Sequence, residues 1–429
     1  MTLAKKILFV VEALTFAHVA RSAILAKALK SSGYEIHFAC HNNQYLSLMA
    51  KELEGIRLWP LKYHVSYSDF VRSMSHFRSP YDINMLGAYI SEELELFNEI
   101  KPDMVVGDLR YSLALSCPKA NIYYVNVVNA IWSPFVRQNL INPNNSLSQY
   151  FGAFWANSVF QFVGKRMSRS ICQPFNQLRV KQGLPIFNDV FELHCAGDMN
   201  LHPDPPELFD VPFLPKNHEF IGPILYSVNP PTSPDLNLLE PSLPVIIVTL
   251  GSSGAVDCLP NIIGCLEKMP VSLLVATSGR KDVIANNSHT IISDFFCARR
   301  VIQKSSLVIS NGGSPISYLA LSQGVPVIGV VSNMDQRLTA QAIEKYGAGL
   351  VLSAESLNEN KLKQAVNRIL VEPAFGERAQ VISKKIFGAK TFANFQAAIE
   401  RAFLFLKEQD DKKLVNLDYC RQEKLGRRS

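Results

Sequence analysis

The feature that most constrains this chain is an alternation of strand-length apolar runs with helical patterns, which occurs twice along the sequence. The first series opens with Ile7–Val11, continues with helical spacing over Val19–Ser31, and returns to a strand in YEIHFAC. The second series starts at LPVIIVTLG and alternates in the same way as far as GVPVIGVV. Strands that alternate with helices form parallel sheets through right-handed crossovers. The sequence therefore predicts an α/β fold with two similar parallel-sheet domains that face each other across a cleft.

A proline-rich stretch separates the two series. Residues 226–244 (YSVNPPTSPDLNLLEPSLP) hold five prolines and show almost no periodicity, which is typical of a linker. A chain of 429 residues is also longer than one core usually organises. We therefore expect an N-terminal domain over 1–225, a linker over 226–244, a C-terminal domain over 245–406, and a charged, frayed tail over 407–429.

The net charge of +6 is concentrated in one segment. Between Leu109 and Asn188 the sequence has no Asp or Glu but eight Lys and Arg, and the stretch 150–181 adds many aromatic residues. We favour an ordinary interpretation, in which the rings belong to the core and the bases to a solvated face. The alternative is peripheral contact with an anionic membrane through 150–181. No signal peptide and no spanning run of roughly 18 apolar residues is present. We expect a cytoplasmic protein, at the inner membrane face under the alternative, with no nucleic-acid partner.

Glycine-rich turns distinguish the two halves. The first strand is followed by EALTFAH, which has no glycine and argues against a standard NAD or FAD site. Gly251–Gly254 (GSSG) and Asn311–Ser314 (NGGS) instead follow strands of the second half and place N–H groups at helix starts, where anions bind. A phosphorylated ligand is therefore expected on the C-terminal domain. The eight cysteines form no CxxC pair and have no histidine at zinc spacing, so we expect neither a metal nor a cofactor.

Residues Ser306–Leu352 resemble the donor-site signature of the inverting nucleotide-sugar glycosyltransferases, which include the UDP-glycosyltransferases and the bacterial macrolide and glycolipid transferases. The family signature reads HGGxGTxxEAL, GVP, DQxxNA and GxG, and GG, AL, GVP, DQ and GAG stand here at the same spacings. The likeness extends to Ile221–Leu225, Thr249–Ser253 and FAHVARSAILAKAL. It implies the GT-B architecture of two facing Rossmann-like domains. It also implies a UDP- or dTDP-sugar donor on the C-terminal domain and an apolar or amphipathic small-molecule or lipid acceptor on the N-terminal one.

His18 and Asp108 are the catalytic residues that this resemblance implies. The family's general base is the His of a GHxxP motif, which matches Ala17–Arg21 except that its Gly and Pro are absent. The Asp that orients the base ends a strand reading PDLVVxD, which is Pro102–Asp108 here. His18 has a core or capping role as its alternative, and its position favours the catalytic one. Asp108 is equally well explained as an ordinary helix N-cap.

The resemblance also implies a set of donor-binding residues. Amides of Gly312, Gly313 and Ser314 are expected to meet the diphosphate, and Asp335 and Gln336 to bind sugar hydroxyls. The other expected contacts are Gly251, Ser252, Ser253 and Asn311.

Several positions depart from the family pattern. The diphosphate-binding His is Asn311, the Gly-Thr step is Pro315-Ile316, the ribose-binding Glu is Leu319, and a Pro-Gln step is Cys297-Ala298. Weakened contacts of about 1–3 kcal/mol each lower donor affinity by orders of magnitude.

Two functions therefore stay open: an active inverting glycosyltransferase with His18 as general base, which we favour, and a catalytically weakened member that binds or activates a partner. A nucleotide-sugar epimerase is a weaker third reading, because the motifs do not supply its several acid–base groups.

Overall fold

The computed structural model describes residues 4–137, 168–227, 234–236, 239–251, 253–280 and 282–426. The first sheet has the order β3-β2-β1-β4-β5-β6-β7, and every neighbouring pair is parallel. Its strands are β1 (Lys6–Val11), β2 (Glu35–His41), β3 (Arg57–Leu61), β4 (Met104–Asp108), β5 (Tyr123–Val127), β6 (Met199–His202) and β7 (His218–Phe220). The chain order reverses between β1 and β4, where Val11 pairs with Asp108.

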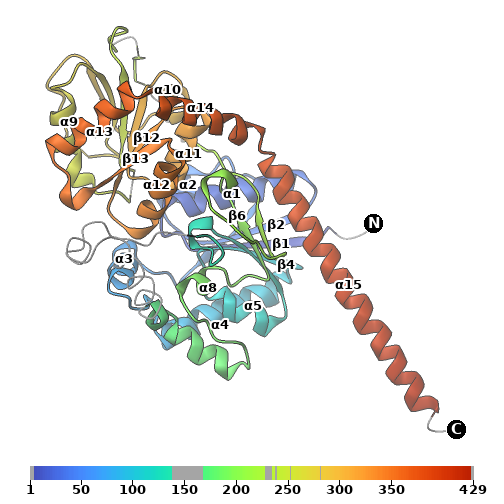
Figure 1. Ribbon diagram of the computed structural model, residues 1–429. Helices are drawn as coiled ribbons and strands as arrows, with labels where there is room; N and C mark the ends of the chain where they lie inside the picture. Colours follow the sequence, from blue (N-terminus) through green and yellow to red (C-terminus); the bar gives the residue numbers. More distant parts are fainter. Residues whose placement is uncertain are drawn as a thin grey trace.

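The second sheet repeats this design with the order β10-β9-β8-β11-β12-β13, again parallel throughout. Its strands are β8 (Val245–Thr249), β9 (Ser272–Ala276), β10 (Thr290–Ser293), β11 (Leu307–Ser310), β12 (Val327–Val331) and β13 (Gly349–Ser353). The order reverses between β8 and β11. The predicted fold of two parallel-sheet α/β domains is confirmed, and Figure 1 shows the second domain above the first.

Helices connect the strands of both sheets and cover them (Figure 1). In the first domain they are α1 (Phe16–Ser31), α2 (Gln44–Leu48), α3 (Tyr67–Ser75), α4 (Ile83–Ile100), α5 (Leu113–Ala120) and α8 (Val190–His194), with the 3₁₀ turns η1 (Ala130–Trp132) and η2 (Pro206–Leu208). After β8 come η4 (Val256–Cys258), α9 (Leu259–Leu266), α10 (Ala298–Ile302), α11 (Ser314–Ser322), α12 (Met334–Tyr346), η5 (Ala354–Ser356), α13 (Glu359–Val371), α14 (Pro373–Gly388) and α15 (Thr391–Gly426).

Helix α1 begins earlier than the apolar periodicity indicated. The helical pattern predicted a start at Val19, whereas the helix starts at Phe16 after the extended residue Thr15. Phe16 and His18 both line the cleft, and Phe16 also packs against the first core, so the start of the helix does not follow the apolar stripe alone. His18 consequently lies in the first turn of α1 and not in the preceding loop.

The C-terminal helix α15 returns to the first domain. Phe395, Ala398, Ile399, Ala402 and Phe403 are buried in the same core cluster as β1 and α1. Their spacing of three and four residues forms one helical stripe, which supplies the apolar face that packs there. Residues 391–406 therefore belong to the first domain, contrary to the predicted boundary. The stretch expected to be a frayed tail continues this helix to Gly426, and α15 projects beyond the domain (Figure 1).

Most of the basic aromatic segment 150–181 lies outside the described residues. Residues 168–181 are helical, with Ile171, Cys172 and Phe175 buried in a core cluster. That part agrees with the ordinary interpretation, and the membrane contact remains a prediction. In the described part of the chain, no helix is both long enough and apolar enough to cross a membrane.

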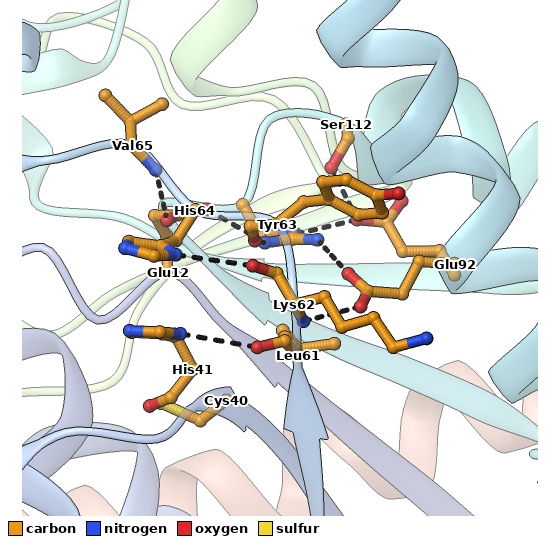
Figure 2. A network of polar contacts seen from close by, with 12 residues as sticks. Glu12, Cys40, His41, Leu61, Lys62, Tyr63, His64, Val65, Glu92 and Ser112 are labelled. Carbon is orange, nitrogen blue, oxygen red and sulfur yellow. Dashed lines mark hydrogen bonds and ion pairs between the residues drawn. The ribbon is translucent and has the colours of Figure 1, made fainter.

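A buried ion network fixes the loop that follows β4. The Arg110 side chain is 1% exposed, and its Nε and Nη1 donate to Glu93 Oε1 at 2.7 Å and Glu12 Oε2 at 3.0 Å. Its guanidinium also lies 3.9 Å from the centre of the Tyr89 ring. Burial outweighs the Arg110 charge and raises the pKa of Glu12. Several carboxylate contacts of this network are drawn in Figure 2, including the Val65 N–H to Glu12.

Leu109 stands between this network and Asp108 with a left-handed backbone, at φ 57°. A residue with a Cβ adopts this conformation only where the surroundings impose it, at a cost of order 1–3 kcal/mol. The buried charges of Asp108 and Arg110 on either side provide that constraint.

We expect Arg110→Met to destabilise the protein strongly. Removing the cation leaves the Glu12 and Glu93 carboxyls buried without their positive partner, which typically costs about 3–5 kcal/mol. Urea unfolding followed by circular dichroism measures this change. Arg72→Met is the control, because its pair with Asp69 is exposed and its loss is expected to cost less than about 0.5 kcal/mol. Equal small effects for both variants would contradict the anchoring role of Arg110.

Candidate active site between the two sheets

A cavity of about 1020 Å³ lies between the two domains. It is lined by the carboxyl-end loops of both sheets, including His18, Arg21 and Trp132 from the first domain and Ser314 and Asp335 from the second. Ligands of open parallel sheets bind where the strand order reverses, outside the carboxyl ends of the strands. Both reversal points, β1/β4 and β8/β11, contribute to this one cavity.

His18 and Asp108 meet at the first reversal point. His18 Nδ1 lies 2.8 Å from Asp108 Oδ1, and their side chains are 17% and 1% exposed. A hydrogen bond from Nδ1–H to the carboxylate leaves Nε2 as the basic nitrogen of an imidazole that lines the cavity. The structure thus brings together the two residues that the sequence assigned to catalysis, in the geometry of a base and its orienting carboxylate.

Asp108 has a second strong partner that sequence reasoning missed. Arg21 donates through Nε and Nη2 to the two Asp108 oxygens, and the Ser22 hydroxyl donates to Oδ2 at 3.1 Å. Burial alone would raise the pKa of Asp108, but the charges of Arg21 and His18 and their hydrogen bonds lower it to about 2. The available signal was an arginine on α1 one turn after His18, within an otherwise small and apolar run.

The glycine turns of the second domain meet at the other reversal point. Asn311 Nδ2 donates to Ser253 Oγ at 3.3 Å, which ties the turn after β11 to the turn after β8. Gly251 has φ 60° and also lines the cavity. Ser252 lies outside the described residues.

The amides expected to hold a diphosphate are not equally accessible. The Gly312 and Gly313 N–H groups donate to Ser310 Oγ and Asn311 Oδ1, both at 3.0 Å. Helix α11 has no side-chain cap at its N-terminus, and Pro315 has no N–H. The first-turn amides that remain for an anion are therefore those of Ser314 and Ile316.

Asp335 and Gln336 have separate roles in this structure. The Gln336 side chain is 2% exposed and fully bonded, with Nε2 donating to Ser253 O at 2.8 Å and Oε1 accepting from Ser332. Asp335 is exposed and accepts the Trp132 indole N–H at 2.9 Å across the cleft. Both residues line the cavity, where the Gln336 amide braces the loops of its own domain and the Asp335 carboxylate accepts from Trp132.

A buried carboxylate also links the two domains. Asp204 accepts hydrogen bonds from the Tyr318 hydroxyl of α11 at 2.6 Å, from Asn129 Nδ2 at 2.8 Å and from the Ala130 N–H at 2.6 Å. Burial raises its pKa, and these three donors oppose that rise. Asn129 Nδ2 also approaches Ser314 Oγ at 3.4 Å. No sequence motif had pointed to Asp204 or Asn129.

The first-domain wall of the cavity is largely apolar and aromatic. Its larger side chains include Phe16, Tyr45, Phe70, Met74, Tyr111 and Trp132. The Trp132 ring stacks on His194, with centroids 4.1 Å apart and planes 9° apart. His194 Nδ1 lies 2.7 Å from Val190 O and Nε2 lies 2.7 Å from the Tyr111 hydroxyl. Both nitrogens are engaged and burial lowers the pKa of His194 to about 4, so this histidine is a neutral wall residue rather than a base.

Comparison with known proteins agrees with this geometry. Residues 264–391 match the family described as erythromycin biosynthesis protein CIII-like, C-terminal domain. The chain is 36% identical over 405 residues to a PGL/p-HBAD biosynthesis glycosyltransferase of Mycobacterium tuberculosis (strain H37Ra), covering 93% of this chain and 92% of the relative. It is 33% identical over 409 residues to a PGL/p-HBAD biosynthesis rhamnosyltransferase of Mycobacterium bovis (strain BCG), covering 94% and 89%. The chain belongs to this glycosyltransferase family.

Solved glycosyltransferases have the same GT-B fold. The glycotransferase of kitacinnamycin superposes with a TM-score of 0.69 at 18% identity, covering 93% of this chain and 99% of that one. The spinosyn rhamnosyltransferase SpnG, complexed with thymidine diphosphate, gives 0.66 at 15% identity, covering 92% and 100%. The relatives also include an inactive PGL/p-HBAD biosynthesis glycosyltransferase of Mycobacterium bovis, 35% identical over 271 residues, covering 62% of this glycosyltransferase and 71% of that protein.

We expect the buried His194 to make this glycosyltransferase less stable in acid. Unfolded histidine has a pKa near 6.5, above the folded value of about 4, so only the unfolded chain takes up a proton between these pH values. The free energy of unfolding therefore falls as pH decreases from about 6.5 to 4, and this group has no effect above about pH 7. Urea unfolding at several pH values tests this, with His194→Gln expected to show a shallower slope in that interval. Identical slopes would contradict the assignment.

Proposed function

We propose that this chain is an active inverting glycosyltransferase that transfers a sugar from a nucleoside diphosphate donor to a hydroxyl of an apolar or amphipathic acceptor. The observation that carries the proposal is the His18–Asp108 pair, which shares one cavity with the uncapped N-terminus of α11. One reversal point supplies a general base and the other supplies amides for a leaving phosphate. The relatives' glycosyltransferase names support the same reaction class.

The proposed reaction needs only these groups. His18 Nε2 removes the acceptor hydroxyl proton as the oxygen attacks the anomeric carbon, and Asp108 stabilises the imidazolium that forms. The bond between the anomeric carbon and the phosphate oxygen breaks on the opposite face, which inverts the configuration. The leaving diphosphate is met by the Ser314 and Ile316 amides and by the positive end of the α11 dipole.

Positive charge on the donor side is available from Arg337. Among the described residues that line the cavity, it is the one cation from the second domain. Its side chain is partly buried, burial lowers its pKa, and it makes no side-chain hydrogen bond or ion pair with the described residues. Arg337 therefore offers the charge that Asn311 does not supply. Asp335, whose Oδ1 already accepts from Trp132, offers its other oxygen to a sugar hydroxyl.

The acceptor side fits a partner with apolar surface. The aromatic wall that includes Phe16, Phe70 and Trp132 lies on the same side of the cavity as His18. Such a wall binds flat or chain-like apolar groups through burial of their surface. The proposed acceptor therefore presents a hydroxyl on an apolar or amphipathic body.

A catalytically weakened, partner-binding protein is the second candidate function. The Gly312 and Gly313 amides are already bonded, Leu319 is 1% exposed, and an inactive relative exists. This function requires only that the two-domain shell and its cavity be kept.

Donor binding separates the two candidates. A nucleoside diphosphate held by the folded protein at one hundred times its Kd stabilises it by about 2.7 kcal/mol. We therefore expect a rise in melting temperature with UDP or dTDP, or with their sugars, and a measurable Kd by titration calorimetry. Arg337→Met is expected to weaken that binding. Absence of binding by every nucleotide at millimolar concentration would favour the partner-binding function.

Removal of the base is the test of the chemistry. We expect His18→Ala to lower kcat about 10²- to 10⁴-fold while leaving the Kd for the nucleotide unchanged, because His18 acts on the acceptor proton. His289→Ala is the matched control, since that histidine does not line the cavity. A His18→Ala variant that transfers sugar at the wild-type rate would rule out His18 as the base.

A further inference from the structure

Arg21 is placed to act on the base rather than on a substrate. It follows His18 by three residues on α1, so the two side chains leave the same face of the helix. The Arg21 side chain is 9% exposed, and its Nε and Nη2 reach both oxygens of the carboxylate that orients His18. This is the position at which the resembled GHxxP motif has a proline, which makes no such contact.

The third nitrogen of the same guanidinium binds a residue that contacts the other domain. Arg21 Nη1 donates to Asn129 Oδ1 at 2.6 Å, and Asn129 Nδ2 approaches Ser314 Oγ at the start of α11 at 3.4 Å. A continuous chain of polar contacts therefore runs from His18 through Asp108, Arg21 and Asn129 to Ser314. Only a planar fork with several donors makes these contacts together, so lysine is not an equivalent residue.

The ion pair also changes the charge available to His18. In a simple dyad the full negative charge of the carboxylate stabilises the imidazolium. Here the guanidinium compensates that charge, and its Nη2 lies 3.2 Å from His18 Nδ1. A positive charge at this distance opposes a second one on the imidazole.

We propose that Arg21 is a positioning residue that fixes Asp108 for His18, connects the dyad to the donor helix α11, and holds a positive charge beside the imidazole. This inference rests on the proposed transferase function.

Other titratable groups interact with His18, Arg21 and Asp108, and their protonation bears on how a pH–rate profile is interpreted. Those that interact with these three residues include Asp204 after β6, Tyr226 after β7, Tyr111 after β4, His194 on α8 and Tyr318 on α11. Burial raises the pKa of the three tyrosines and lowers that of His194 to about 4, so none of these four titrates near neutrality. Asp204 is held by its three donors. Burial raises the pKa of Asp204, so NMR of histidine-labelled protein is needed to assign a change of rate near neutral pH to His18.

The test compares Arg21→Ala and Arg21→Lys in the full chain. For Arg21→Ala we expect kcat/KM to fall 10- to 100-fold, and the pH of half-maximal kcat/KM on the acid side to rise by about one unit. Added guanidinium should restore part of kcat by filling the space left by the side chain. Arg21→Lys keeps the charge but loses the fork, so its kcat should fall while its acid limb stays in place. Ser22→Ala removes a neutral donor to Asp108 and should leave the acid limb unmoved.

The outcomes separate this inference from the proposed function. Arg21→Ala with the wild-type rate and profile, or with a loss that guanidinium does not restore and an unshifted acid limb, overturns the role of Arg21. A wild-type protein that transfers no sugar overturns the proposed function instead. In that case NMR of histidine-labelled protein still follows His18 as pH changes. A protonation midpoint that rises in Arg21→Ala supports the inference, and an unchanged midpoint overturns it.

Discussion

The first domain of this molecule and its candidate site depend on one buried carboxylate. Asp108 ends β4 at the point where the strand order of the first sheet reverses, and it accepts from His18, Arg21 and Ser22. A buried carboxylate is stable only when its oxygens are fully bonded and its charge is paired. These requirements hold α1 against the end of β4, and His18 takes its orientation from the same contacts. Asp108 therefore contributes both to the packing of the first domain and to the geometry of the candidate site.

A second buried network supports the first from the other side of Leu109. Arg110 is held by Glu12 at the end of β1 and by Glu93 on α4, so the loop after β4 is anchored in two directions. The left-handed backbone of Leu109 places oppositely charged neighbours, Asp108 and Arg110, on opposite sides of the loop. Asp108 orients His18 at the cavity, whereas the charge of Arg110 is buried between the carboxylates of Glu12 and Glu93. The stability of this loop is thus a condition for the geometry of the His18–Asp108 pair.

The sequence predicted the features that periodicity and turn chemistry carry. Strands β1, β2, β4, β8 and β12, the division into two parallel-sheet domains and the meeting of His18 with Asp108 follow from apolar runs, glycine turns and a recognisable motif. The return of α15 was missed, because a helical stripe such as Phe395 to Phe403 does not reveal which sheet it packs on. Arg21, Asn129 and Asp204 were missed because their hydrogen bonds to Asp108, to Arg21 and to residues 129–130 span 74 or more residues, and no local pattern encodes such contacts. At Gln336 the motif was recognised in the sequence, but no local pattern indicated that its side chain is hydrogen-bonded to Ser253 of its own domain.

On the proposed donor side, the turn after β11 departs from the family signature, whereas the uncapped start of helix α11 is kept. In the turn after β11, Asn311 accepts a hydrogen bond from the Gly313 N–H and donates one to Ser253. These hydrogen bonds close the turn, so it is not left open for an anion. The uncapped first turn of α11 remains, and it is the same turn that Asn129 reaches from the first domain. A charge arriving there would act on Ser314, and through Asn129 and Arg21 on the carboxylate that orients His18. The departures from the family signature and the contacts that span the cleft thus meet at one helix start, which joins the proposed donor site to the proposed base.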